Sequence, residues 1–170
     1  MDHRLTPSLG SRPPSNMPPL PLSQQETDAE ELIPVYRVLL AEDNPADVMV
    51  LEEILLQQRD AKFEIAIASD GQQAIQLVKG LDKDGSLPSF DIALVDLNLP
   101  KHTGHEVLAT IRKAKRSCEI PVIIVTSSRS PTDIKRARDL GANEYFEKVP
   151  DLDAYSALGP LVVRTLQKRR

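Results

Sequence analysis

Tryptophan is absent from the 170-residue chain, and aromatic residues make up only 4% of it. Such a chain has few rings to stack on bases or sugars, and its net charge of −4 disfavours nonspecific nucleic-acid binding. The single cysteine, Cys118, excludes an internal disulfide and fits a reducing cytoplasm. No apolar run approaches the roughly 20 residues of a membrane span, and no apolar block resembles a signal peptide. We therefore expect a single-core cytoplasmic protein that binds neither nucleic acid nor membrane.

Proline is concentrated at the start of the chain, where seven of the 14 prolines lie in the first 34 residues. Such a segment cannot bury enough apolar surface to offset the entropy lost on ordering, so residues 1–34 are predicted to be a disordered tail. Its "PPLPL" stretch has the PxxP spacing that aromatic grooves bind, but a solvated leader is the favoured interpretation. Residues 35–170 are predicted to form one domain, with no effector domain after it.

Short apolar runs of strand length follow the tail, and most are rich in Ile and in Val or Leu. They span residues 36–43, 62–69, 90–96, 120–127 and 143–148. The stretches between them have the apolar spacing of helices rather than of strands. Strands and helices that alternate five times predict an α/β fold, in which a doubly wound parallel sheet is covered on both faces.

Local signals place the helix boundaries. The predicted helices include residues 45–58, 104–114, 131–140 and 151–169. Asn44 and Ser130 are each followed by proline, which is typical of an N-cap and the first helical position. Gly141 is predicted to end the helix that Ser130 begins. In the last helix, the Gly-Pro pair ending at Pro160 predicts a kink or a break.

Polar residues stand at the carboxyl ends of the predicted strands, where ligands of an open α/β sheet bind. Glu42 and Asp43 follow the first strand and Asp96 follows the third. Thr126 closes the fourth strand and Lys148 follows the fifth. Three acids, a hydroxyl and an amine are therefore predicted to converge on one edge of the sheet.

The clustered acids need a counter-charge, because two charges ~4 Å apart repel by roughly 4 kcal/mol at an effective dielectric constant of ~20. A few oxygen ligands open to water suit Mg²⁺ better than zinc. Lys148 then offers a charge for phosphoryl oxygens and Thr126 a hydrogen-bond donor. This set predicts phosphoryl transfer to a carboxylate, with Asp96 as nucleophile. Taken singly, the residues have ordinary alternatives, since Glu42 and Asp43 could only cap a helix.

Four stretches, "VLLAEDNPAD", "DIALVDLNLPKHTG", "IPVIIVTS" and "GANEYFEK", resemble the response-regulator receiver domain of two-component signalling. The resemblance covers residues 35–168 and implies a flavodoxin-like (βα)₅ fold with strand order 2-1-3-4-5. It implies that Asp96 is the phosphoacceptor, which takes its phosphoryl group from the phosphohistidine of a sensor histidine kinase. It also implies a signalling protein rather than an enzyme, one that catalyses only its own phosphorylation and dephosphorylation.

The resemblance assigns the remaining site residues as well. Asp43 matches the direct Mg²⁺ ligand, Glu42 the acid that acts through water, and the backbone carbonyl of Asn98 the third protein ligand. Thr126 and Lys148 match the pair that contacts the phosphoryl oxygens. The resemblance thus implies one Mg²⁺-dependent phosphorylation site.

The predicted output is a protein contact, because no DNA-binding domain is expected. Tyr145 matches the aromatic switch that turns inward on activation, and the resemblance implies an output face formed by the fourth helix, fifth strand and fifth helix. A homodimer through this face is a further expectation. The segments "KGLDKDGSLPSFD" and "DLNLPKHTG" resemble the small receivers that work with bacterial phytochromes, so a phytochrome kinase is the expected partner.

The chain departs from the family after the fifth strand. Receivers usually carry Lys-Pro there, whereas Lys148 is followed by Val149, and Pro150 comes one place later. A cis peptide bond before Val149 would cost ~3 kcal/mol, so a trans bond or a shifted loop is expected. Because of this departure, the sequence does not decide whether the Lys148 side chain points toward Asp96.

Two other functional classes share some of these sequence features. A phosphohydrolase of the haloacid-dehalogenase type also phosphorylates an aspartate, but it needs a second acid where this chain has Asn98, and a cap domain for which there is no room. A receiver-shaped scaffold that is never phosphorylated is the other alternative, which the complete acidic set disfavours. His102 and His105 are predicted to lie in a solvated loop rather than to act as a base or a metal ligand.

Overall fold

The computed structural model describes residues 33–168 of the chain. Its strands are β1 (Val35–Ala41), β2 (Lys62–Ala68), β3 (Ile92–Val95), β4 (Val122–Thr126) and β5 (Glu144–Glu147). They pair in parallel, in the order β2-β1-β3-β4-β5, so the predicted doubly wound, flavodoxin-like sheet is confirmed. Each predicted strand overlaps an observed one, and the excess residues belong to the connecting loops.

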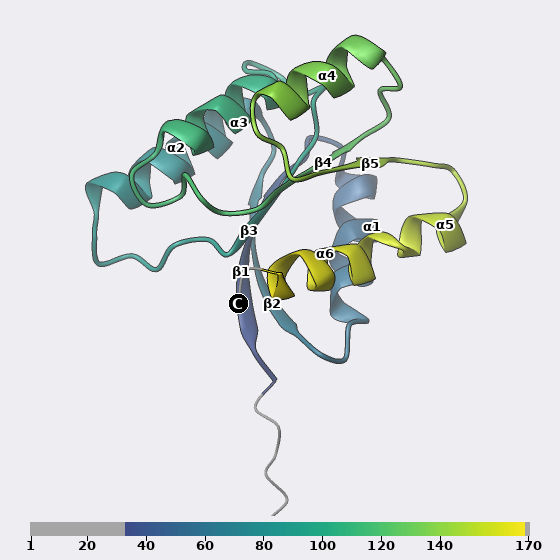
Figure 1. Cartoon of the computed structure of the whole chain (residues 1–170). Coiled ribbons are helices and arrows are strands. Elements are labelled where there is room, and N and C mark those ends of the chain that lie inside the picture. Colours follow the sequence, from purple (N-terminus) through teal and green to yellow (C-terminus); the bar gives the residue numbers. More distant parts are fainter. Residues whose placement is uncertain (1–32, 169–170) are drawn as a thin grey trace, which may run out of the picture. The chain divides into compact units, whose positions relative to one another are not determined.

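Both faces of the sheet are buried beneath helices (Figure 1). The helices are α1 (Pro45–Leu56), α2 (Gly71–Lys83), α3 (Gly104–Lys113), α4 (Pro131–Asp139), α5 (Leu152–Ser156) and α6 (Leu158–Gln167). One core lies between the sheet and α2, α3 and α4, and the other between the sheet and α1, α5 and α6. In β1, Leu39 faces the first core and Leu40 the second. Because successive strand residues point to opposite faces, apolar runs without alternation are what such a sheet requires.

Side-chain hydrogen bonds confirm the predicted N-caps of α1 and α4. The side chain of Asn44 accepts from the backbone N–H of Ala46 at the start of α1, and Ser130 caps α4 in the same way. Gly141, just beyond α4, has a φ of 90°, a conformation that glycine adopts without strain. The sequence therefore encodes these ends locally.

The last predicted helix is divided in two, but the break lies earlier than the Gly-Pro pair. Helix α5 ends at Ser156, and α6 begins at Leu158. Pro160 has no N–H to donate to the carbonyl of Ser156, four residues earlier, so the helix cannot continue through Ala157. Proline therefore breaks this helix one turn before its own position.

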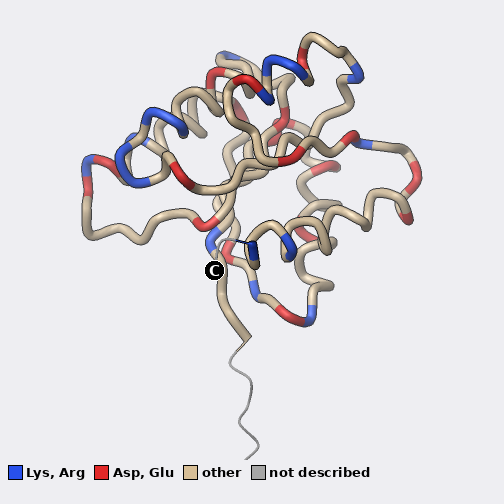
Figure 2. Tube along the Cα trace, viewed as in Figure 1, with Lys and Arg blue, Asp and Glu red and all other residues tan. Residues whose placement is uncertain are grey.

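Some expectations fall outside the described residues. The predicted tail 1–34 does so, apart from Ile33 and Pro34. Within residues 33–168, no helix is long and apolar enough to cross a membrane. Basic and acidic residues are intermixed along the described chain, as Figure 2 shows.

Candidate functional site

Asp96 and Glu42 leave the sheet side by side, because β1 and β3 are neighbours in register. Ala41 pairs with Val95, and the N–H of Asp96 donates to the carbonyl of Ala41 at 2.9 Å. Both carboxylates follow directly at the carboxyl edge of the sheet, and both residues are buried. This is the topological switch point at which such sheets bind ligands, so the predicted convergence of these acids is confirmed.

Lys148 follows β5, and its side chain extends across the carboxyl edge of the sheet to these two acids. Its backbone N–H donates to the carbonyl of Thr126 at 2.8 Å, which continues the pairing of β4 and β5. Its amine donates to Asp96 Oδ2 at 2.7 Å and to Glu42 Oε2 at 2.5 Å. Within residues 33–168 every peptide bond is trans, so the expected trans bond before Val149 is confirmed. Lys148 therefore reaches Asp96 without the usual proline.

Asp47 completes the set and was not predicted. It lies in the first turn of α1, where its Oδ2 accepts from the Lys148 amine at 2.9 Å. The helix dipole alone explains an acid in a first helical turn, so the sequence offered no reason to expect the contact with Lys148. No local spacing reveals this contact, because Asp43, the acid four residues earlier, precedes the N-cap Asn44 and does not lie on the helix.

The surroundings shift two of these groups in pKa. Burial raises the pKa of Glu42 above its ordinary value, although the hydrogen bond from Lys148 opposes this. Burial lowers the pKa of Lys148, but its hydrogen bonds to Asp96, Glu42 and Asp47 outweigh burial and hold the pKa above its usual range. The amine is therefore charged at neutral pH, and in the described part of the chain it is the one cation that pairs with Glu42, Asp47 and Asp96.

The acids form a cluster that could hold a metal ion. Carboxylate oxygens of Glu42, Asp43 and Asp96 all lie within 4.8 Å of one another, and Asp43 is exposed. They border a cavity of about 480 Å³ that Asn98 also lines. The backbone N–H of Asn98 donates to Asp96 Oδ1 at 3.0 Å, so both oxygens of Asp96 are oriented by the protein. Oxygen ligands with room for water suit a hard divalent cation.

Thr126 and Tyr145 are joined by a chain of hydrogen bonds through the loop between β4 and α4. The buried hydroxyl of Thr126 accepts from the N–H of Ser128 at 3.3 Å. The carbonyl of Ser128 in turn accepts from the Tyr145 hydroxyl at 2.9 Å. The sequence predicted roles for Thr126 and Tyr145 but none for Ser128, because Ser128 links them through its backbone N–H and carbonyl. A movement of Thr126 toward Asp96 would therefore disturb Ser128 and, through it, the hydrogen bond of the Tyr145 hydroxyl.

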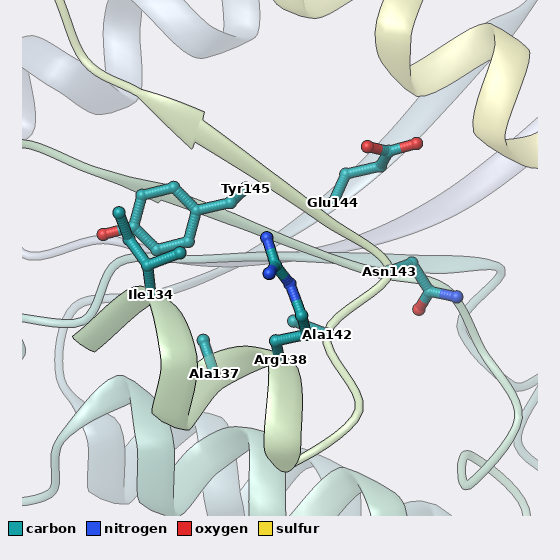
Figure 3. A pocket seen from close by; sticks show the side chains of 7 residues that line it. All are labelled: Ile134, Ala137, Arg138, Ala142, Asn143, Glu144 and Tyr145. Carbon is teal, nitrogen blue, oxygen red and sulfur yellow. The ribbon is translucent and has the colours of Figure 1, made fainter. Parts of the chain in front are cut away.

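Tyr145 also borders a groove between α4 and β5 (Figure 3). The groove has a volume of about 210 Å³, and Ile134 and Arg138 of α4 face it together with Tyr145 and Glu144 of β5. In Figure 3 the ring of Tyr145 lies beside Ile134, with its hydroxyl pointing away from Arg138. The orientation of Tyr145 thus determines the shape of this groove.

Tyr145→Phe is expected to lower the free energy of unfolding by about 1 kcal/mol, because the carbonyl of Ser128 loses its donor. Urea unfolding followed by circular dichroism measures the effect. Ser128→Ala is the matched control, since it keeps the backbone carbonyl, and the Tyr145→Phe loss should be the same in that background. An unchanged urea midpoint for Tyr145→Phe would contradict the hydrogen bond.

The two histidines near the site differ in their burial. His105 is buried at 5% exposure, and its Nε2 lies 3.3 Å from the carbonyl oxygen of Asp133 in α4, so the prediction of a solvated loop is wrong for it. The reason is that His105, in the first turn of α3, packs against α4, a contact between elements that the sequence does not show. His102 is half-buried and contacts Glu106 at 3.2 Å. Neither lines the acidic cavity.

Known proteins resemble this arrangement along most of the chain. A model of the response regulator receiver domain matches residues 38–157. Response regulator Rcp1 of Synechocystis sp. is 32% identical over 124 residues, 73% of this chain and 84% of that protein. The rice response regulator ORR1 is 32% identical over 114 residues, which is 67% of this chain but only 49% of ORR1.

Two crystal structures support the same grouping. That of the phosphorylated cyanobacterial phytochrome response regulator RcpA has a TM-score of 0.70 and 28% identity, covering 79% of this chain and 96% of that one. That of the Mn²⁺-bound form of Rcp1 has a TM-score of 0.66 and 31% identity, covering 74% and 91%.

Proposed function

Because this chain belongs to the response-regulator receiver family, we propose that Asp96 accepts a phosphoryl group from a sensor histidine kinase in a Mg²⁺-dependent reaction. The observation that carries the proposal is the environment of Asp96. Its carboxylate borders an open cavity, next to a cluster of acids and within 2.7 Å of the charged amine of Lys148. Family members act in phosphorylation-dependent signalling, and the phosphohydrolase alternative is not favoured.

The donor set fits Mg²⁺. Asp43 and Asp96 would bind it directly, Glu42 through water, and Asn98 through its carbonyl. All are oxygen donors, and the carboxylates lie within 4.8 Å of one another. Once bound, the cation would neutralise the charge shared by carboxylate and phosphoryl oxygens. The Mn²⁺-bound form of Rcp1 supports a divalent cation in this family.

In the proposed transfer, an oxygen of Asp96 attacks phosphorus as the bond from phosphorus to the kinase imidazole breaks. The imidazole nitrogen keeps the electron pair of the broken bond. Lys148 turns to a phosphoryl oxygen, and the hydroxyl of Thr126 donates to another. The chain catalyses only this transfer and the later hydrolysis of the acyl phosphate, in which water attacks phosphorus and releases inorganic phosphate and the free carboxylate of Asp96, so it is a signalling protein rather than a turnover enzyme.

The proposed output runs from Thr126 through Ser128 to Tyr145. When Thr126 is drawn toward the phosphoryl group, its hydrogen bond with Ser128 weakens, and the Tyr145 ring moves into the space released. The groove in Figure 3 then changes shape. We propose that a downstream protein, or a second copy of this chain in a homodimer, reads the face formed by α4, β5 and α5.

The kinase implied by the family is a sensor histidine kinase, and we propose that it is a bacterial phytochrome acting in the cytoplasm. The description of RcpA as a phytochrome response regulator supports this partnership, as does the likeness to Rcp1. We propose residues 35–170 as the receiver domain.

Acetyl phosphate tests the proposal without knowledge of the kinase. The full chain with MgCl₂ is expected to gain the mass of one phosphoryl group, released by alkali as an acyl phosphate is. Peptide mapping should locate it within 91–100, and removal of Mg²⁺ by a chelator should prevent it. Asp96→Asn is the matched control. An adduct that persists in this variant, or none on the wild type, would overturn the proposal.

A further inference from the structure

Tyr155 has a packed ring and an unpaired hydroxyl. The residue is 4% exposed, and its ring stacks on Phe146 with centroids 5.8 Å apart and planes at 16°. Its hydroxyl oxygen is shielded from solvent and has no hydrogen-bond partner within residues 33–168. A buried hydroxyl without a partner is destabilising, and phenylalanine would fill the same space without this cost. Packing therefore explains the ring but not the hydroxyl.

The Tyr155 side chain borders the cavity that holds the proposed phosphorylation site, together with Asp47, Asp96 and Lys148. Burial raises the pKa of its phenol to about 12, and the charge of Lys148 only partly offsets this. The phenol therefore stays protonated at neutral pH and keeps a hydrogen to donate. An unused donor thus belongs to a residue that borders the same cavity as several acceptors.

Lys148 has no donor to spare. Its ammonium group carries three N–H bonds, and it donates to Glu42, Asp47 and Asp96. A phosphoryl group on Asp96 brings new anionic oxygens. When Lys148 turns to one of them, a carboxylate that it now binds must lose its donor.

Asp47 is the carboxylate that this movement leaves without compensation. Glu42 and Asp96 belong to the proposed metal cluster, whereas Asp47 does not. In the described part of the chain, its side chain accepts a hydrogen bond only from Lys148. The side chain of Asp47 is only 29% exposed, so water replaces the lost donor poorly.

We propose that Tyr155 is a positioning residue of this site, whose hydroxyl donates to Asp47 when Lys148 turns to the phosphoryl group. The resting protein holds Asp47 through Lys148, and the phosphorylated protein holds it through Tyr155. This exchange frees Lys148 without leaving the half-buried carboxylate of Asp47 unpaired. The inference rests on the proposed function, since it requires a phosphoryl group on Asp96.

Beryllium trifluoride, a mimic of the phosphoryl group, tests this exchange in the full chain with saturating MgCl₂. Tyr155→Phe is expected to weaken its binding about tenfold, as the loss of one hydrogen bond to a charged group does. Titration calorimetry measures this affinity. Without ligand, the unfolding midpoint of Tyr155→Phe should equal or exceed that of the wild type, because the hydroxyl is then unpaired.

The double variant with Asp47→Ala separates this role from packing, because alanine has no side-chain oxygen to accept from Tyr155. Once the carboxylate is gone, the further change Tyr155→Phe should leave beryllium trifluoride affinity unchanged. An equal loss in both backgrounds would mean that Tyr155 acts on the ligand directly or through packing, and would overturn the inference. A lowered midpoint for ligand-free Tyr155→Phe would also overturn it, since the hydroxyl would already be bonded.

Failure of the proposed function gives a different result. A wild type that neither binds beryllium trifluoride nor gains a phosphoryl group would remove the proposed function and this inference together. A wild type that does both, beside a Tyr155→Phe variant of equal affinity, would overturn the inference alone.

Discussion

Lys148→Ala is expected to lower the free energy of unfolding by about 3 kcal/mol at neutral pH, because buried carboxylates lose the one cation that pairs with them within residues 33–168. The side chain of Glu42 is 1% exposed and that of Asp96 is 8% exposed. Lys148 itself is 11% exposed and donates to both. This expected loss of unfolding free energy is at the lower end of the range for breaking a buried ion pair, because the cavity is open and admits water.

Two conditions should reduce this deficit. MgCl₂ supplies a cation to the same acids, so it should raise the urea midpoint of Lys148→Ala more than that of the wild type. Acid should act in the same direction. The pKa of Glu42 is raised by burial, and loss of the lysine raises it further. The penalty of the buried charge is complete above this raised pKa and falls as Glu42 takes up a proton.

Lys135→Ala is the matched control for the loss of one lysine. Its amine pairs with Asp139 at 2.6 Å, but the side chains are 76% and 60% exposed. An ion pair in water contributes little, so this variant should change stability by less than about 0.5 kcal/mol and should not respond to MgCl₂. If Lys148→Ala were as stable as Lys135→Ala, the carboxylates would not depend on Lys148.

The sequence allowed the edge of the sheet to be predicted because its geometry is local. Asp96 follows an apolar run of strand length, and parallel strands end together, so the position of one strand end predicts its neighbours. The position of Lys148 at the end of its strand was predicted in the same way, but Val149 in place of proline left the direction of its side chain undecided. The structure gives the reason that proline is dispensable: the backbone bond to Thr126 already fixes the residue.

What the sequence did not reveal depends on packing between distant segments. Asp47 looks like an ordinary first-turn acid until Lys148, 101 residues away, is placed against it. His105 looks like a solvated residue until α4 is packed against the start of α3. The hydroxyl of Tyr155 has no local signal, because its meaning lies in the partner that it lacks. Local patterns predict elements, whereas contacts between elements emerge only in the fold.

Gly104→Ala is expected to be the most damaging change that adds a single methyl group near the site. A Cβ at Gly104 would lie 2.1 Å from the backbone oxygen of Asp96 and 2.8 Å from the Cα of Leu97. Both contacts are with backbone, so no side-chain rotation relieves them. The N–H of Gly104 also donates to the carbonyl of Leu97 at 3.0 Å, which holds α3 against this segment.

The methyl group must therefore displace the segment that carries Asp96. Overpacking of this kind costs about 3 kcal/mol, and a misplacement near 1 Å slows a reaction about a hundredfold. Urea unfolding measures the first effect. The initial rate of phosphorylation by acetyl phosphate, taken where the variant is folded, measures the second. A normal rate in a destabilised variant would mean that Asp96 is positioned independently of α3.

Gly80→Ala is the matched control, because it adds the same methyl group to α2, where nothing lies within 4 Å of the new Cβ. Alanine inside a helix restricts the unfolded chain, so this variant should gain about 0.5–1 kcal/mol. The same substitution thus has opposite signs at the two positions. At Gly80 the missing side chain only weakens a helix, whereas at Gly104 it allows α3 to contact the backbone that holds Asp96.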